Sequence, residues 1–222
     1  MKYYKFKEKK QRNLTIGKII CLARTYKKHA EEMNANITKD PVLFLKPNSS
    51  VIFDKETIII PKLSKNVHHE VELGIVIGKK GKNIRKNDAT NHVLGYLLGL
   101  DITARDMQSE AKRKGLPWSI SKGFDTFTPI SNVILKEKIS NINNLDICLK
   151  VNGEIRQESN TKFMIYSIEE IIEFVSRIFT LEEGDLILTG TPEGVSEIKD
   201  GDLVEATIDN SFSLKLNVKN EI

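Results

Sequence analysis

The most constraining feature of this sequence is a pair of glutamates inside an otherwise apolar stretch. Residues 67–78 have the composition of a buried strand, but Glu70 and Glu72 interrupt it two positions apart. Side chains alternate between the faces of a strand, so both carboxylates are expected on one face. Two negative charges there are costly unless they are solvated, paired or bound to a cation. Asp101, in a second apolar stretch over residues 93–103, offers a third carboxylate.

Three interpretations of these acidic residues remain open from the spacing alone. Three carboxylates without a thiolate favour a hard cation, Mg²⁺ or Mn²⁺, with Ca²⁺ as a further option. His68 lies on the same predicted face, and a histidine with carboxylates would favour iron or zinc. The third interpretation is a solvent-facing edge strand without any metal.

Length and charge limit the number of domains and the kinds of partner that this chain can have. The chain has 222 residues and a net charge of +4, and no long Pro/Gly/Ser linker divides it. We expect one domain over residues 1–222, with residues 1–15 as a short N-terminal extension or strand. The mild, dispersed charge argues against nucleic acid as a partner, and no apolar run is long enough for a membrane span. Cys21 and Cys148 form no paired motif, which favours a reducing, cytoplasmic location.

Hydrophobic periodicity predicts a mainly β fold with a few helices, an α+β class. Strands or extended segments are expected at residues 16–22, 41–47, 57–60, 67–78, 93–103, 145–151, 185–188, 203–208 and 214–218, with turns at 152–153 and 209–210. Helices are expected at residues 27–33, 103–114 and 168–179. The last should begin with a capping box formed by Ser167 and Glu170.

A second candidate for chemistry lies in the first predicted helix. His29 and Glu32 are three residues apart, so they share one helix face. A carboxylate beside a histidine can fix its tautomer and raise its basicity. A surface pair without a chemical role has the same spacing, so the pattern alone does not decide.

Six motifs run through the chain in the order typical of one family. They are PVLFLKP at 41–47, HHEVELG at 68–74, DITARD at 101–106, KGLPW at 114–118, VNGEIRQ at 151–157 and LEEGDLILTGTP at 181–192. The sequence resembles the fumarylacetoacetate hydrolase superfamily, and most of all its small members of the acylpyruvase or oxaloacetate decarboxylase type. One departure is visible at residues 23–26, where the family's Gly-Arg-Asn-Tyr is replaced by Ala-Arg-Thr-Tyr.

The resemblance implies a rolled mixed β-sheet, a homodimer and a set of site residues. In that family, carboxylates matching Glu70, Glu72 and Asp101 bind Mg²⁺ or Mn²⁺, which leaves His68 a structural role. Residues matching His29 and Glu32 form a catalytic pair on a segment that orders as a lid. Lys122 matches a lysine in the catalytic site. Residues near the substrate are matched by Arg24, Arg105, Gln108 and Thr191.

The activity implied is metal-dependent hydrolysis of the C–C bond of acylpyruvates, giving pyruvate and a carboxylate. Oxaloacetate decarboxylation is a companion activity, so the expected partner is a small α-keto acid. Relatives that isomerise or decarboxylate unsaturated dicarboxylates, of the 2-hydroxyhepta-2,4-diene-1,7-dioate isomerase type, give the alternative. A non-catalytic ligand-binding module is disfavoured, because such a protein should have lost the acid–base residues that are all present here.

Overall fold

The computed structural model describes residues 1–8, 13–33, 40–209 and 211–222. Within these ranges the chain forms an eight-stranded sheet in the order β2-β1-β13-β6-β7-β9-β3, with β10 paired to β7. The bounds are β1 (Ile19–Ala23), β2 (Val42–Lys46), β3 (Val51–Phe53), β6 (Val71–Ile77), β7 (Val93–Leu100), β9 (Thr128–Ile130), β10 (Ile134–Leu135) and β13 (Leu186–Leu188).

A second sheet has five strands in the order β12-β11-β14-β15-β4. Its members are β4 (Thr57–Ile60), β11 (Asp146–Val151), β12 (Glu154–Asn160), β14 (Leu203–Ile208) and β15 (Phe212–Asn220). A two-stranded ladder joins β5 (Val67–His68) to β8 (Thr103–Ala104). Parallel pairs such as β1 with β13 occur beside antiparallel ones such as β6 with β7, so the sheets are mixed.

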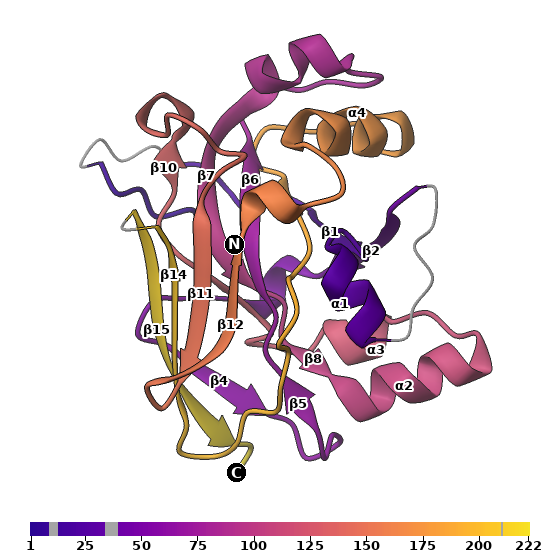
Figure 1. The fold of residues 1–222 in the computed structure, drawn as a ribbon, viewed down its shortest axis with the longest axis vertical. Helices are drawn as coiled ribbons and strands as arrows, with labels where there is room; N and C mark the ends of the chain where they lie inside the picture. The colour runs from indigo at the N-terminus through magenta and orange to yellow at the C-terminus, as the bar shows by residue number, and fades with distance from the viewer. Residues whose placement is uncertain (9–12, 34–39, 210) are drawn as a thin grey trace.

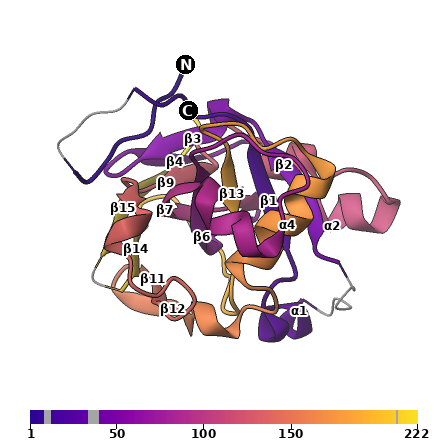
Figure 2. The same ribbon diagram turned by 90° about the horizontal axis from the view of Figure 1, so that it is seen from above.

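The helices are few and short. They are α1 (Lys27–Glu32), α2 (Arg105–Lys114), α3 (Ser119–Lys122) and α4 (Ile168–Ile178), with 3₁₀ turns η1 (Asn48–Ser50), η2 (Lys86–His92), η3 (Lys136–Lys138) and η4 (Thr161–Phe163). Figure 1 shows α1, α2 and α3 gathered on one side of the molecule and the strands β11, β12, β14 and β15 on the other, and Figure 2 shows α2 across the molecule from β14 and β15. The mainly β class expected from the sequence is confirmed.

Strand alternation places the main core between the two sheets. In β6, Leu73 and Ile75 belong to the same buried cluster as Leu149 of β11 and Val204 of β14. Val76 points the other way, into a smaller cluster that includes residues of the N-terminal segment. Glu72 has the parity of Val76, so its carboxylate leaves the sheet on the face away from the main core.

Helix α4 forms as its sequence predicts. The Ser167 hydroxyl accepts a hydrogen bond from the Glu170 amide at 3.3 Å, and the Glu170 carboxylate accepts one from the Ser167 amide at 2.8 Å. This capping box satisfies amides that the first helical turn leaves free. The apolar face, which includes Ile171 and Val175, is buried in the main core.

The prediction of one long strand over residues 67–78 is wrong in one respect. The segment divides into β5 and β6, and Glu70 lies in the break between them. In this break the His69 amide donates a hydrogen bond to the Ser196 carbonyl at 3.2 Å. Helix α2 begins at Arg105, and 103–104 belong to β8. The sequence did not predict α3, β3, β9 or β10, because elements this short do not show a hydrophobic periodicity. Residue 210 of the predicted turn lies outside the described residues.

Candidate active site

The acidic residues meet at one end of the eight-stranded sheet. Strands β6 and β7 are antiparallel, and their register pairs Val71 with Leu100. The start of β6 therefore lies beside the end of β7, and the Asp101 amide donates to the Glu70 carbonyl at 2.9 Å. Strand β13 ends at the same place, where the Gly190 amide donates to Glu72 Oε2 at 2.8 Å.

This topology brings the three predicted metal ligands together. One carboxylate oxygen each from Glu70, Glu72 and Asp101 lies within 4.8 Å of the other two. The three residues are 6%, 1% and 1% exposed, so the cluster is buried. Over the part of the chain that the structure describes, this group contains carboxylates and no histidine or cysteine, which favours a hard cation over zinc or iron.

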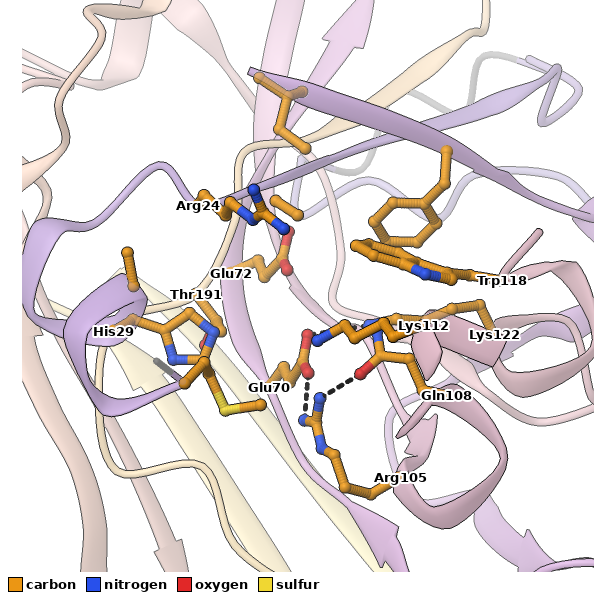
Figure 3. Close-up of a pocket in the computed structure, with 15 residues that line it drawn as sticks. Arg24, His29, Glu70, Glu72, Arg105, Gln108, Lys112, Trp118, Lys122 and Thr191 are labelled. Atoms are coloured by element: carbon orange, nitrogen blue, oxygen red, sulfur yellow. Dashed lines mark hydrogen bonds and ion pairs between the residues drawn. The ribbon is translucent and has the colours of Figure 1, made fainter. Parts of the chain in front are cut away.

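Two cationic side chains hold Glu70. Lys122 Nζ donates to Glu70 Oε2 at 3.0 Å and to Thr103 Oγ1 at 2.7 Å, and it also contacts Asp101. Arg105 donates from one guanidinium nitrogen to Glu70 and from another to Gln108 Oε1 at 2.6 Å. Figure 3 shows these side chains converging on Glu70 from α2 and α3.

The two glutamates consequently differ in charge environment. Burial raises the pKa of Glu70, but the charges of Lys122 and Arg105 outweigh that effect and hold the pKa well below its ordinary value. Burial raises the pKa of Glu72 well above its ordinary value, and the negative charges of Asp101 and Glu70 add to this rise. A divalent cation between the carboxylates would remove that repulsion. The donor set therefore fits the metal that the sequence implies.

Lys46 belongs to the site but was not among the residues singled out from the sequence. It is 2% exposed, and its Nζ donates to Asp101 Oδ1 at 2.6 Å and to the Ile102 carbonyl at 3.1 Å. A buried lysine is stable only when paired, and Asp101 supplies the pair. The sequence feature that could have identified it is its position in the motif PVLFLKP at 41–47, where a lysine directly follows the apolar run of residues 42–45.

His29 and Glu32 share a face of α1, as their spacing predicts. His29 Nδ1 lies 3.2 Å from Glu32 Oε2, and the Gly194 amide donates to the same carboxylate at 3.1 and 3.2 Å. His29 is 9% exposed and lines the same pocket as Glu70 and Glu72. The pair can therefore position an imidazole in the pocket that Glu70 and Glu72 also line.

The residues expected near substrate line this same pocket. Its described lining includes Arg24, Arg105, Gln108, Thr191 and Lys122, together with side chains not predicted from sequence, Phe44, Lys112 and Trp118. Arg24 follows β1 with a φ of 64°, a left-handed conformation that a non-glycine residue rarely adopts. The pocket thus combines the two glutamates of the acidic cluster, His29 and several cationic side chains.

Two histidines next to Glu70 in sequence form hydrogen bonds with residues around the site. Burial and the nearby Arg105 charge lower the pKa of His68 to about 4, and its Nδ1 accepts from Arg105 Nε at 3.4 Å. Burial also lowers the pKa of His69 to about 4; its ring nitrogens lie 2.9 Å from Gln157 Oε1 and 2.9 Å from Ser196 Oγ. Neither joins the acidic cluster, which agrees with a structural role for His68.

Gln157 connects His69 to Thr191, which lines the pocket. Its Nε2 donates to Thr191 Oγ1 at 2.8 Å, and its Oε1 accepts from the Val71 amide at 3.1 Å. Gln157 is 1% exposed, so these bonds lie in the interior. The side chain fixes the loop of Thr191 relative to the first residue of β6.

A rolled mixed β-sheet fold with a buried carboxylate cluster, a histidine–glutamate pair and cationic walls is typical of an enzyme site whose carboxylates suit a divalent metal ion. The family comparison is more specific. The family model "Fumarylacetoacetate (FAA) hydrolase C-terminal" matches residues 18–219. This chain belongs to the fumarylacetoacetate hydrolase family of enzymes, as its motifs predict.

Curated relatives match most of the chain. The Mus musculus protein named oxaloacetate tautomerase FAHD1, mitochondrial, is 49% identical over 201 residues, which cover 90% of this chain and 91% of the mouse protein. The Dictyostelium discoideum protein named oxaloacetate decarboxylase, mitochondrial, is 47% identical over 212 residues, covering 93% of this chain and 97% of that one. These relatives are named as mitochondrial, so the cytoplasmic location expected from the cysteines is not confirmed.

The fold is also that of solved members of the family. Fumarylpyruvate hydrolase from Pseudomonas aeruginosa, crystallised with Mn²⁺ and pyruvate, superposes with a TM-score of 0.94 at 34% identity, covering 98% of this chain and 95% of that one. Within the described residues, every helix is too short or too polar to cross a membrane.

Proposed function

We propose that this enzyme acts on oxaloacetate and related 2-oxo acids through the enolate of their pyruvate half, with decarboxylation of oxaloacetate as its main reaction. The observation that carries the proposal is the buried cluster of Glu70, Glu72 and Asp101, whose two glutamates line one pocket with Lys122 and His29. The names of the mouse and Dictyostelium relatives, which share nearly half of the aligned residues, support oxaloacetate as the substrate.

The three carboxylates would hold Mg²⁺ or Mn²⁺, whose Lewis acidity polarises a 2-oxo carboxylate and favours its enolate. Arg105 and Gln108 would orient the substrate carboxylate, since both line the pocket and their mutual hydrogen bond fixes their side chains. Arg24 and Thr191 would contact the substrate from the opposite wall, where β1 and β13 end.

Lys122 would supply positive charge where the enolate develops. Burial lowers the pKa of this lysine, but the carboxylates of Asp101 and Glu70 outweigh the effect and raise it above the ordinary value. The ammonium form therefore persists at neutral pH. A fixed charge of this kind needs no reorganisation during the reaction, which makes it effective in stabilising developing negative charge.

The His29–Glu32 pair would carry out the proton transfers. In oxaloacetate, the bond between C3 and the distal carboxylate breaks, CO₂ leaves, and the electron pair becomes the pyruvate enolate. Protonation of its C3 then gives pyruvate. In the related tautomerisation, a proton leaves C3 and one is added to the 2-oxo oxygen. Glu32, held by the Gly194 amide, would keep the His29 imidazole in place for these transfers.

Acylpyruvate hydrolysis is the second candidate, and the same pair favours it. His29 would take a proton from water, whose oxygen then adds to the distal carbonyl carbon. Cleavage of the C–C bond releases a carboxylic acid and the pyruvate enolate, which is protonated on carbon. Isomerisation of unsaturated dicarboxylates is the remaining alternative; it needs proton transfer but no attacking water.

A panel assay tests the proposal. Oxaloacetate, acetylpyruvate and fumarylpyruvate are each incubated with the chelator-treated protein, with and without Mg²⁺ or Mn²⁺, and pyruvate is measured. The proposal expects metal-dependent pyruvate formation above the uncatalysed rate, with oxaloacetate the best substrate. Acylpyruvate turnover that exceeds decarboxylation would make hydrolysis the main activity. Turnover of none of them with either metal would contradict the proposal.

We also propose that the protein is a homodimer of single-domain subunits and that it acts in the cytoplasm. Sedimentation velocity of the full chain tests the first point, and imaging of the untagged protein with an antibody tests the second.

A further inference from the structure

The side-chain amide of Gln157 has an orientation that its neighbours determine. Its Oε1 lies 3.1 Å from the backbone nitrogen of Val71, whose N–H can only donate. Its Nε2 lies 2.9 Å from the carbonyl oxygen of Pro192, which can only accept. Reversing the amide would break both hydrogen bonds, and Gln157 is 1% exposed, so bulk water does not replace them. The oxygen therefore faces Val71 and the nitrogen faces Pro192.

His69 agrees with this orientation from a second direction. Its Nδ1 lies 2.9 Å from Gln157 Oε1. The amide oxygen carries no proton, so Nδ1 is the donor in this hydrogen bond. Gln157 Oε1 thus accepts from two N–H groups, and the NH₂ end of the amide is left to face the loop that begins at Thr191.

The orientation of the amide sets the direction of the Thr191 hydroxyl. Gln157 Nε2 lies 2.8 Å from Thr191 Oγ1, and because the amide nitrogen can only donate, Oγ1 accepts. A hydroxyl has a single proton, which must then point away from Gln157. Within the described ranges, Gln157 is the hydrogen-bond partner of Thr191 Oγ1, so the threonine proton meets no acceptor of the protein there.

The loop around Thr191 is held on both sides of this residue. The Gly190 amide donates to Glu72 Oε2 at 2.8 Å, and the Gly194 amide donates to the Glu32 carboxylate at 3.1 and 3.2 Å. Thr191 itself is 3% exposed and lines the pocket. Its hydroxyl oxygen is therefore fixed in place, and the pocket is the direction left open to its proton.

Thr191 lies where the reacting end of a substrate would be. Figure 3 shows it on the same side of Glu70 as His29, with Arg105 and Gln108 on the other side. A substrate held by Arg105 at one carboxylate would place its other end, on which His29 acts, beside the Thr191 hydroxyl. A donor there forms a charge-assisted hydrogen bond with an anionic oxygen, whereas a lone pair there would repel the same oxygen.

We propose that Gln157 is a positioning residue that keeps Thr191 as a hydrogen-bond donor to an anionic oxygen of the substrate. This inference rests on the proposed function, because it assigns a direction to the contact between Thr191 and the substrate. Gln157 does not line the pocket itself. It acts through one hydrogen bond, which occupies a lone pair of Thr191 and turns the threonine proton toward the ligand.

Neutron diffraction from crystals of the full chain exchanged into D₂O tests the direction of the hydroxyl without relying on turnover. The proposal expects the deuterium atoms of Gln157 Nε2 to point at Thr191 Oγ1 and at the Pro192 carbonyl. It expects the deuterium of Thr191 to point into the pocket. A Thr191 deuterium that points at Gln157 would overturn the proposal.

Binding of oxalate to the Mn²⁺-loaded protein tests the role of Gln157 by calorimetry. Oxalate is an unreactive mimic of the pyruvate enolate, and its oxygens can only accept. The variants are Thr191→Val, Thr191→Ser, Gln157→Leu and the double variant Gln157→Leu/Thr191→Val. Ser196→Ala is the matched control, because it removes a hydrogen bond to His69 and leaves Gln157 and Thr191 in place.

Thr191→Val should lower the oxalate affinity about tenfold, as for the loss of a hydrogen bond to a charged group, and Thr191→Ser should restore it. Gln157→Leu should lower it about threefold, because the Pro192 carbonyl, deprived of its donor, then competes for the threonine proton. In the Thr191→Val background, Gln157→Leu should have no further effect, and Ser196→Ala should bind oxalate like the wild type.

These outcomes separate positioning from general support of the fold. A loss caused by Gln157→Leu that persists in the Thr191→Val background would overturn the proposal, as would unchanged affinity in Thr191→Val. Should Gln157→Leu not fold, the neutron map and the two Thr191 variants still decide. A Thr191 deuterium that points into the pocket of a protein that fails the pyruvate assay would contradict the proposed function alone.

Discussion

The two glutamates at the start of β6 should respond in opposite directions to the same substitution. Glu70 is held by Lys122 and Arg105, whereas burial and two neighbouring carboxylates disfavour the charge of Glu72. Glu70→Gln removes a charge that two buried cations need. Glu72→Gln removes a charge that its surroundings oppose and keeps an amide oxygen for the Gly190 N–H.

The magnitudes follow from these contacts. Removing one partner of a buried ion pair costs about 3–5 kcal/mol, and the glutamine oxygen still accepts from Arg105, so we expect about 3 kcal/mol for Glu70→Gln. For a chain of this size that lowers Tm by about 6–12 °C. For Glu72→Gln we expect no loss, and up to about 1 kcal/mol of added stability from removing an unfavourable buried charge.

The assay is thermal unfolding followed by circular dichroism, first with a chelator and then with increasing Mn²⁺. A ligand at one hundred times its dissociation constant stabilises the folded state by about 2.7 kcal/mol, so the wild-type Tm should rise by about 5–11 °C. Both variants should lose most of this rise. Glu154→Gln, on the exposed edge strand β12, provides the control and should behave as wild type.

Two results would refute this reasoning. If Glu72→Gln destabilised the chelated protein as much as Glu70→Gln, the charge asymmetry between the two residues would be wrong. If either variant kept the full Mn²⁺-dependent rise in Tm, that glutamate would not be a metal ligand.

Three further predictions concern residues around the cluster. Lys46→Met leaves Asp101 Oδ1 without its lysine partner and should lower the free energy of unfolding by about 3 kcal/mol in urea denaturation; a loss below about 1 kcal/mol would mean that Lys122 alone suffices. His29→Ala should lower acylpyruvate hydrolysis by at least about 100-fold and oxaloacetate decarboxylation less, in parallel kcat/KM measurements; equal losses would indicate that His29 only shapes the pocket. Gln157→Leu should cost about 2 kcal/mol, measured by urea denaturation, because the Val71 amide loses its buried acceptor; unchanged stability would show that water replaces the side chain.

Much of the fold was predictable from local patterns. Aliphatic runs identified most long strands, and the capping box at Ser167 marked the start of α4 correctly. The break at Glu70 was not predictable, because it depends on the His69 amide bonding to Ser196, a residue distant in sequence. Short elements such as β9 are held by neighbouring strands and have no periodicity of their own.

The site was predictable only to the extent that it is local or shared with the family. Spacing placed His29 beside Glu32, and the motifs brought Asp101 together with the two glutamates. The buried pairing of Lys46 with Asp101 and the position of Lys112 over Trp118 depend on tertiary contacts between separate segments. Neither contact has a signature in the spacing of the residues that make it.

Deuterium exchange into pyruvate tests the central claim most directly, because it reports the enolate itself. The protein is incubated with pyruvate and Mg²⁺ in D₂O, and loss of the methyl proton signal is followed by NMR before and after chelation. The account predicts exchange above the protein-free rate that requires metal and is lost in Glu72→Gln. Exchange no faster than in a protein-free control with the same metal, or exchange that persists after chelation, would contradict it.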